Sequence, residues 1–304
     1  MTQPYLVSVR LMVYNHEPYI REAIEGILKQ RTNFLVEVVI GDDFSTDKSL
    51  EIIREYENTS NIHFKILERK VGDEYWVNRQ KLGRLHNFYN IIENCTGKYI
   101  ALLDGDDYWT DPLKLQKQAD FLEENQEYAG CFHKIKALMG DKIVEDIDIE
   151  NRYDKVKVKD KITRMDLLQE GNFIHSCSFM YRNIDFVFSD ELTQSPVGDI
   201  LFFLNICSNG HLKRIDEYMA VYRRGTGIYS SLSSVEMCKK KMQYHLCILS
   251  SLVDANERKL FLKISLELIG QYEKVIRLDE KSTFQKKIDS LKILIFRFIK
   301  KHKN

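Results

Sequence analysis

Residues Tyr99–Asp107 read YIALLDGDD, an apolar run followed by three carboxylates in four positions. The run Tyr99–Leu103 predicts a buried strand, because apolar strand-forming residues follow one another without a polar interruption. Carboxylates this close repel one another, and the repulsion costs stability unless a cation lies among them. The acidic end of this strand is therefore a candidate site, with a solvated acidic loop as the alternative.

Two earlier strands are predicted at Leu6–Val13 and Val36–Ile40. The first ends in Tyr14-Asn15, and the second ends in the polar stretch Asp42–Asp47. Helix patterns lie between the strands, and this alternation predicts an α/β fold with a mainly parallel sheet and helices on both faces. Ligands bind beyond the carboxyl ends of such strands. The polar stretch could also be only a turn that caps a helix.

The rest of the chain predicts further elements. Helices are expected at Ile20–Ile27, Leu50–Tyr56, Phe88–Ile92, Asp111–Asn125 (with Asp111 as N-cap) and Ile200–Ile206, and strands at His63–Leu67, Ala129–Met139, Cys177–Tyr181 and, as two short ones, within Leu212–Arg223. Asp141–Asp160 is expected to be a polar, variable insertion, and the pattern beyond Ser233 is helical only. We expect a catalytic-type domain at residues 1–231 and a C-terminal helical extension at residues 232–304.

Composition excludes several classes of protein. The chain has 304 residues with 45 basic and 45 acidic side chains, so its formal net charge is zero. A nucleic-acid binder would carry a basic excess, and no nucleic-acid partner is expected. The six cysteines form no CxxC pair and are expected to be buried thiols in a reducing cytosol. No membrane-spanning segment is expected either, which predicts a cytoplasmic protein.

Two acidic clusters at neighbouring strand ends suit a divalent ion, since Mg²⁺ and Mn²⁺ prefer oxygen ligands and also bind phosphates.

Three motifs carry a family resemblance: Val7–Val9 with Tyr14-Asn15, the stretch Asp42–Asp47, and Gly97–Ile100 running into Leu103–Asp107. In this order they resemble the inverting family 2 glycosyltransferases of GT-A fold, over Leu6 to about Ser231.

The resemblance implies a nucleotide-sugar site. Tyr14 would stack on the nucleobase and Asp43 would hydrogen-bond it, which favours uracil and hence a UDP-sugar donor. Asp104-Gly105-Asp106-Asp107 matches the family's DxD element. Asp104 and Asp106 would bind the nucleotide sugar, and Asp106 and Asp107 would lie nearest the ribose and the Mn²⁺ or Mg²⁺ ion. Either of the last two could be the direct metal ligand.

Asp199 is the candidate catalytic base, because Gly198-Asp199 resembles the segment where the family places its catalytic aspartate. A helix N-terminus favours the ionised carboxylate and so weakens it as a base. Asp199 could also be only an N-cap, and Glu191 is the second candidate for the base. His175 and His211 lie in apolar contexts and are expected to be structural.

Basic residues elsewhere are candidates for contacts with the diphosphate. Tyr222-Arg223-Arg224 and the following Gly225–Ser231 resemble the loop that closes over the diphosphate in this family. Arg223 is therefore a candidate donor-binding residue. Arg84, like Arg79, follows the third strand and could reach a phosphate.

We expect an inverting, metal-dependent transfer of a sugar from a UDP-sugar to a glycan or lipid-linked acceptor, in bacterial-type surface polysaccharide assembly. The alternative is a non-catalytic nucleotide-sugar-binding or assembly protein. No GxGxxG follows the first strand, which excludes a nicotinamide oxidoreductase, and without the QxxRW signature processive synthesis is not expected. The C-terminal helix that carries Ile288, Leu291, Ile295 and Phe298 would pack on its own domain, lie on the inner face of the membrane as a peripheral contact, or form a homodimer.

Overall fold

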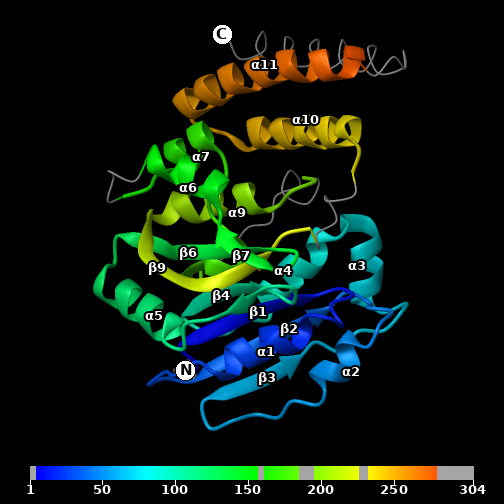
Figure 1. The fold of residues 1–304 in the computed structure, drawn as a ribbon, viewed down its shortest axis with the longest axis vertical. Coiled ribbons are helices and arrows are strands. Elements are labelled where there is room, and N and C mark those ends of the chain that lie inside the picture. The colour runs from blue at the N-terminus through cyan, green and yellow to red at the C-terminus, as the bar shows by residue number, and fades with distance from the viewer. Residues whose placement is uncertain (1–4, 157–160, 185–194, 226–231, 279–304) are drawn as a thin grey trace. The chain divides into compact units, whose positions relative to one another are not determined.

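The structure is a computed structural model that describes residues 5–156, 161–184, 195–225 and 232–278. The chain divides into two compact units, Met1–Gly227 and Ile228–Asn304 (Figure 1). The domain boundary predicted at residue 231 falls in the stretch 226–231, outside the described residues. The predicted amphipathic segment with Ile288 and Phe298 also lies outside them, and both stay predictions.

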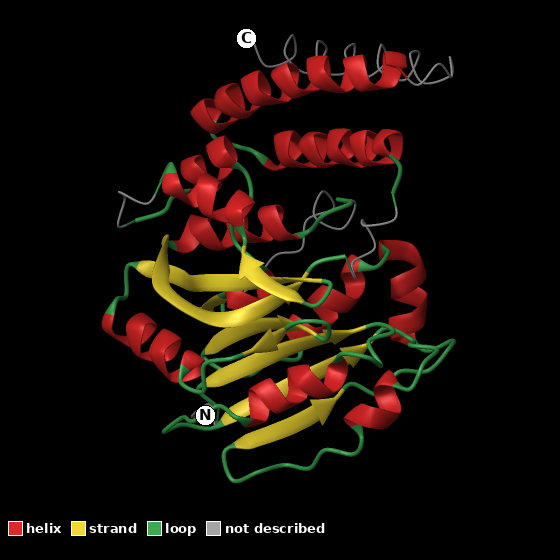
Figure 2. Cartoon of the chain, viewed as in Figure 1, coloured by secondary structure: helices red, strands yellow, loops and turns green. Residues whose placement is uncertain are grey.

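The first unit is built on one sheet, which has nine strands within the described ranges, in the order β3-β2-β1-β4-β8-β6-β9-β5 with β7 paired to β6. The strands are β1 Val7–Val13, β2 Val36–Asp42, β3 Ile62–Ile66, β4 Tyr99–Asp104, β5 Tyr108–Trp109, β6 Tyr128–Met139, β7 Lys142–Glu145, β8 Met180–Arg182 and β9 His211–Arg223. β1 runs parallel to both β2 and β4, with Val13 opposite Asp42 and Met12 opposite Asp104. The carboxyl ends of these three strands therefore meet at one edge of the sheet (Figure 2).

The other half of the sheet is mixed. β8 runs antiparallel to both β4 and β6, β6 runs parallel to β9, and β5 pairs antiparallel with β9. β9 is a single strand of 13 residues, where the sequence predicts two short ones. Its register against β6 shifts around His133–Ile135. The polar pair Asp216-Glu217 therefore lies in a bulge that bends the strand without ending it.

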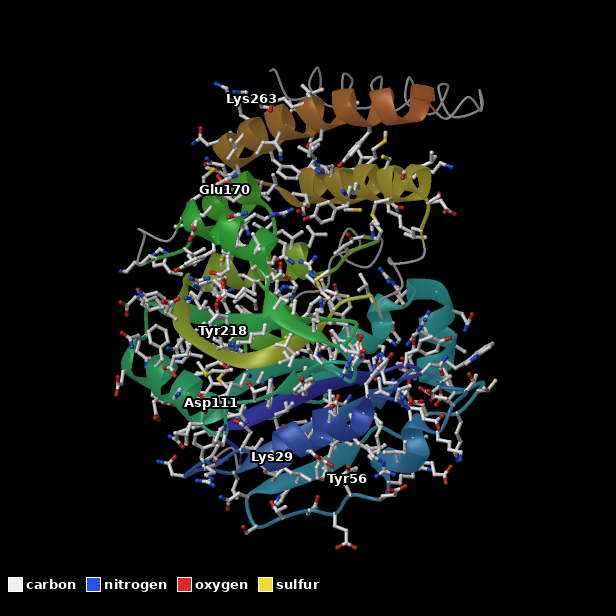
Figure 3. All side chains as sticks on the ribbon, viewed as in Figure 1. Lys29, Tyr56, Asp111, Glu170, Tyr218 and Lys263 are labelled. Carbon is white, nitrogen blue, oxygen red and sulfur yellow. The ribbon has the colours of Figure 1, made fainter. Side chains whose placement is uncertain are left out.

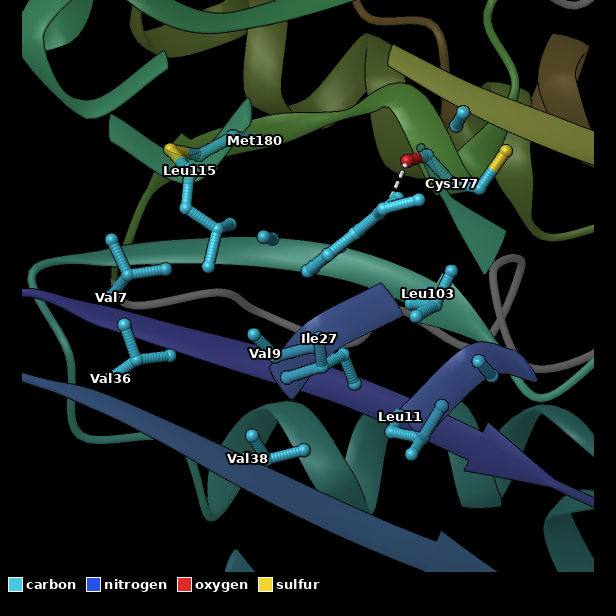
Figure 4. Close-up of a cluster of buried hydrophobic side chains, with 14 of the residues drawn as sticks. Val7, Val9, Leu11, Ile27, Val36, Val38, Leu103, Leu115, Cys177 and Met180 are labelled. Carbon is cyan, nitrogen blue, oxygen red and sulfur yellow. Dashed lines mark hydrogen bonds between the residues drawn. The ribbon is translucent and has the colours of Figure 1, made fainter. Parts of the chain in front are cut away.

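Helices cover both faces of the sheet. In the first unit they are α1 Ile20–Leu28, α2 Ser49–Ile53, α3 Glu74–Leu82, α4 Leu85–Glu93, α5 Lys114–Glu124, α6 Ile147–Asp154, α7 Arg164–Glu170 and α9 Asp199–Ile206. The odd-numbered side chains of β1 pack with Ile27 of α1 and Leu115 of α5 in one apolar cluster (Figure 4). On the opposite face α4 packs on β1 and β2, and the rings of Phe88 and Phe202 of α9 lie 5.1 Å apart. The predicted α/β fold class is confirmed.

The middle of the chain is more ordered than the sequence predicts. The insertion expected at Asp141–Asp160 contains the strand β7, which pairs antiparallel with β6, and the helix α6. The strand predicted at Cys177–Tyr181 begins only at Met180, because Ser176–Ser178 forms a 3-10 turn, η1. Tertiary pairing with β6 decides both outcomes, and a local pattern does not contain that information.

The start of α5 differs from the prediction and buries a lysine. The helix begins at Lys114 and not after Asp111, because the Asp111 carboxylate accepts the Leu113 N–H at 2.8 Å and closes a turn before the helix. Lys114 is fully buried with its ammonium 3.8 Å from the centroid of the Trp109 ring, and burial lowers its pKa to about 7. Lys29, by contrast, lies exposed at the end of α1 (Figure 3).

Lys114→Met is expected to stabilise the protein. Because the pKa of Lys114 is lower in the folded than in the unfolded chain, unfolding takes up a proton, and stability is lost as the pH falls from about 10 toward about 7. Methionine fills similar space without a charge, so the free energy of unfolding near neutral pH should rise by about 1–4 kcal/mol. Urea denaturation measures this gain, which should shrink at alkaline pH. A gain independent of pH would contradict the buried amine as its cause.

The second unit is helical. It contains α10 Ser234–Ser251 and α11 Ala255–Leu278. The two helices pack against each other: the ring of His245 stacks on Phe261 with centroids 5.0 Å apart, and its Nδ1 lies 2.9 Å from Ser265 Oγ. Over the ranges that the structure describes, no helix combines the length and the apolar character needed to cross a membrane.

Candidate active site

The loops that follow β1 and β2 are tied to each other. Asn15 adopts a left-handed conformation (φ 53°), which asparagine tolerates. Its Oδ1 accepts a hydrogen bond from the Thr46 N–H, and its own N–H donates to Ser45 Oγ, both at 2.8 Å. Asp42 in turn accepts the Ser45 N–H at 3.0 Å. The polar stretch after β2 therefore forms a fixed turn, and α2 begins only at Ser49.

Tyr14 and Asp43 lie side by side in the sheet order, at the ends of β1 and β2. Tyr14 is 49% exposed, as a platform for a stacked base must be. Asp43 is buried, and its carboxylate accepts hydrogen bonds from Tyr75 Oη and Arg79 Nε, both at 2.8 Å. These two partners come from α3, a helix that the sequence does not predict. Arg79, expected to be near a phosphate, is thus paired with the carboxylate assigned to the nucleobase.

Asp104 opens the acidic run (Asp104–Asp107) and is paired with a buried arginine. Arg10 lies in the middle of β1 with no exposed surface, and its Nη1 is 2.6 Å from Asp104 Oδ1. Ser176 Oγ donates to the other carboxylate oxygen at 3.0 Å. Breaking such a pair would leave a buried charge without a partner, so the pair fixes the strand end. The sequence carries one signal for it, an arginine inside an otherwise apolar strand.

Asp106 and Asp107 have different surroundings. Asp107 is 1% exposed, and its Oδ1 accepts the Arg223 N–H at 2.8 Å. Burial raises the pKa of Asp107 well above its usual range, and the charges of Asp106 and Asp104 raise it further. The Asp106 carboxylate is more accessible, and its Oδ1 lies 4.0 Å from His16 Nε2. Of the two, Asp106 therefore has the side chain that a ligand can reach.

Arg223 supports the acidic run from the end of β9. Its Nε donates to the Asp106 carbonyl at 2.9 Å, and its Nη2 donates to the Glu22 carboxylate. The guanidinium also lies 4.5 Å from the centroid of the Tyr19 ring. These contacts make Arg223 a support of the candidate metal ligand, and its predicted role in binding the nucleotide sugar stays a prediction.

Asp199 occupies the first turn of α9, directly after the N-cap residue Gly198. Burial raises the pKa of Asp199, and the negative charge of Asp104 raises it further. The positive charges of Arg10 and Arg84 act in the opposite direction. The N-cap position of α9 belongs to Gly198 and not to Asp199. The Asp199 carboxylate interacts electrostatically with Asp104 of the acidic run.

Arg84 lies at the start of α4 and donates a hydrogen bond to the Pro196 carbonyl. It is thus placed beside the segment that leads into α9. Glu191, the second candidate for the base, lies outside the described residues, and so do residues 226–231 of the predicted loop over the diphosphate.

The acidic run fits a divalent ion that is shared with a phosphate ligand. Among the described residues, no cluster of three or more His, Cys, Asp or Glu side chains is placed to hold a metal by itself. Mg²⁺, however, is usually bound through one or two carboxylates together with substrate phosphates. Asp106 has an accessible carboxylate, and the buried Oδ2 of Asp107 makes no hydrogen bond. Asp106 would therefore hold such an ion, with Asp107 as the alternative ligand, and the ion would supply positive charge to a diphosphate.

A polar cluster around His175 was not expected. His175 Nε2 lies 3.2 Å from Asp146 Oδ2, and the centroid of its ring lies 4.2 Å from that of the tilted Tyr222 ring. Arg224 donates to the same Asp146 carboxylate. These residues are far apart in the sequence, so no local motif could have joined them. His211 lies at the start of β9, where the centroid of its ring is 6.4 Å from that of Tyr128.

The fold and the acidic strand end define a GT-A type glycosyltransferase domain. The crystal structure of residues 1–349 of TarS from Staphylococcus aureus in complex with UDP-GlcNAc matches with a TM-score of 0.62 at 20% identity, over 94% of this chain and 79% of that one. The mannosyltransferase PcManGT from Pyrobaculum calidifontis, in complex with GDP-Man and Mn²⁺, matches with a TM-score of 0.54 at 14% identity, over 97% and 86% of the two chains.

The chain belongs to glycosyl transferase family 2, whose family model matches residues 8–186. An uncharacterised protein of Mycobacterium tuberculosis is 34% identical over 228 residues, which are 74% of this chain and 61% of that relative. The chain thus spans 61% of the length of this relative. TarS, a poly(ribitol-phosphate) beta-N-acetylglucosaminyltransferase, is 32% identical over 121 residues, which are 39% of this chain and 19% of TarS. The family resemblance found in the sequence is confirmed.

Proposed function

We propose that this chain transfers a sugar, with inversion, from a UDP-sugar to a glycan or lipid-linked acceptor in the assembly of a surface polysaccharide. The observation that carries the proposal is the common carboxyl edge of β1, β2 and β4, where Tyr14, Asp43 and the acidic run follow three neighbouring strands. The UDP-GlcNAc in the TarS structure supports a uridine nucleotide as the donor.

Different residues at this edge bind different parts of the donor. Tyr14 stacks on the uracil ring, and Asp43 accepts a hydrogen bond from it, with its carboxylate held in place by α3. Asp104 and Asp106 bind the nucleotide sugar, with Asp106 and Asp107 nearest its ribose. Asp106 would hold a divalent ion, which would supply positive charge to the departing diphosphate. We assign Arg84 to the sugar side of the donor, beside the start of α9.

Asp199 is the group that we assign to the acceptor substrate. Its carboxylate takes the proton from the attacking hydroxyl, which approaches the anomeric carbon from the face opposite the diphosphate. The raised pKa of Asp199 makes it a stronger base than an ordinary aspartate, in spite of the helix N-terminus at which it lies.

We place the protein in the cytoplasm. All six cysteines are free thiols, and four of them are buried, which suits a reducing compartment. The helical second unit is the part that we assign to a peripheral contact with the membrane or to a homodimer, because a lipid-linked acceptor would be presented at the membrane surface.

A panel of donors tests the proposed function. The purified chain is incubated with UDP-GlcNAc, UDP-glucose, UDP-galactose and GDP-mannose, each with MnCl₂ or with EDTA, and nucleotide release and thermal stabilisation are measured. We expect metal-dependent release of UDP from at least one UDP-sugar. Stabilisation by UDP without turnover of any donor, also when glycan and lipid-linked acceptors are supplied, would favour the non-catalytic alternative.

Asp43→Ala is expected to weaken UDP binding by about 1–3 kcal/mol, because it removes a charge-assisted hydrogen bond to the base. Calorimetric titration with UDP measures the loss. Tyr75→Phe is the matched control: it keeps the ring and removes one hydrogen bond to Asp43, so its effect should be smaller. Equal affinities of the unaltered protein for UDP and GDP would contradict the assignment of uracil.

A further inference from the structure

Asp146 is a buried carboxylate that the predicted insertion contributes to the first unit. It is 3% exposed and is the N-cap of α6, where it accepts the Ile149 N–H at 3.4 Å. Its remaining contacts lead out of the insertion: His175 Nε2 is 3.2 Å from its Oδ2, and Arg224 donates to both of its oxygens. A helix cap alone would need only the first of these contacts.

The partners hold this carboxylate in its ionised form. Burial alone would raise the pKa of Asp146, but the hydrogen bonds from His175 and Arg224 outweigh it and lower the pKa below its usual range. A buried carboxylate that keeps an arginine and an imidazole as partners is costly to assemble, so its geometry is closely determined. Asp146 therefore fixes the imidazole of His175 from one side.

His175 lies near the acidic run, as the contacts of its ring and of the next residue show. The centroid of its ring lies 4.2 Å from that of Tyr222, with the two rings tilted by 35°, and the next residue, Ser176, donates to Asp104 at 3.0 Å. In its protonated form His175 would lower the pKa of Asp199. With Nε2 directed at Asp146, the other ring nitrogen, Nδ1, points away from that carboxylate. Orientation of an imidazole by a carboxylate on one nitrogen sets what the other nitrogen can do.

We propose that Asp146 is a positioning residue for sugar transfer, because it orients His175 so that Nδ1 hydrogen-bonds the acceptor substrate beside Asp199. The proposal rests on the proposed function, since it concerns the same site. It makes Asp146, the N-cap residue of α6, part of the acceptor side.

Two substitutions and their combination test the proposal. Asp146→Asn removes the charge that orients the imidazole. His175→Gln keeps an amide N–H where Nε2 meets Asp146 and removes Nδ1. Each is expected to lower kcat for donor turnover by about 10–100-fold, the usual range for groups that orient a functional side chain. The double variant should be no worse than the poorer single variant, because both changes remove the same contact.

Asp166→Asn is the matched control. Asp166 is also buried at the start of a helix, α7, and its carboxylate accepts hydrogen bonds from the Thr163 N–H at 2.9 Å and Thr163 Oγ1 at 2.7 Å. It should lose thermal stability and keep kcat. A fully active His175→Gln, or losses in the two single variants that multiply in the double variant, would overturn the proposal.

A second readout separates this proposal from the proposed function. Carbethoxylation of His175 by diethyl pyrocarbonate, located by peptide mass spectrometry, should proceed faster in Asp146→Asn than in the unaltered protein and be unchanged in Asp166→Asn. An unaltered protein that turns over no donor refutes the proposed function, whereas equal modification of His175 in all three proteins refutes its orientation by Asp146.

Discussion

Asp106→Asn is expected to abolish the metal dependence of UDP binding and to lower sugar transfer by about 10²–10³-fold. The Asp106 carboxylate is the accessible one of the last two in the acidic run, and its backbone is fixed by Arg223 at 2.9 Å. Without a carboxylate at this position a divalent ion loses an anionic ligand, and the diphosphate meets the remaining negative charges directly. Calorimetric titration of UDP in MnCl₂ and in EDTA should show two different affinities for the unaltered protein and one, the weaker, for the variant.

Asp107→Asn is the matched control, and it decides which carboxylate is the direct ligand. Asp107 is buried, and asparagine keeps the oxygen that accepts the Arg223 N–H. The variant should therefore keep a manganese-dependent affinity for UDP. If Asp107→Asn loses that dependence and Asp106→Asn keeps it, the ligand is Asp107. If the unaltered protein binds UDP equally in MnCl₂ and in EDTA, the acidic run holds no metal.

Apolar patterning predicts the parallel half of the sheet closely. The strands expected at Leu6–Val13, Val36–Ile40 and Tyr99–Leu103 are β1, β2 and β4, with ends that differ by at most two residues. Continuous apolar runs are sufficient here because strands covered by helices on both faces have no polar side. The helix α3 lacks such a signal. Its residues are mostly polar and only Tyr75 is buried, so tertiary contacts with Asp43 hold it in place.

One part of the candidate site could be predicted from the sequence, and another part could not. Tyr14, Asp43 and the acidic run could be predicted because polar residues at the ends of parallel strands meet at one edge. The residues that hold this part of the site in place could not be predicted. Arg10 and Asp104 are 94 positions apart, and Asp146 and His175 are 29 apart, so each pairing depends on the register of the finished sheet.

The structure shows that opposing effects act on the pKa of Asp199, which the sequence could not show. The helix N-terminus favours the carboxylate, whereas burial and the charge of Asp104 favour the acid and raise the pKa. Because transfer requires the ionised base, we expect activity to fall with decreasing pH through the raised pKa, at a higher pH than an ordinary aspartate would give. A pH profile of kcat measures this acid limb.

Asp199→Asn is expected to lower sugar transfer by about 10²–10⁴-fold, the usual contribution of a general base. The fold should be kept, since asparagine has a similar volume and Gly198, not Asp199, caps α9. UDP binding should survive, because the base faces the acceptor substrate, and the acid limb of the pH profile should disappear with the carboxylate. Asp166→Asn, which alters a buried carboxylate that also lies in the first turn of a helix, should keep both the transfer rate and the acid limb of the pH profile. Near-normal transfer by Asp199→Asn with the limb intact would show that another group accepts the proton, and Glu191 would be the next residue to change.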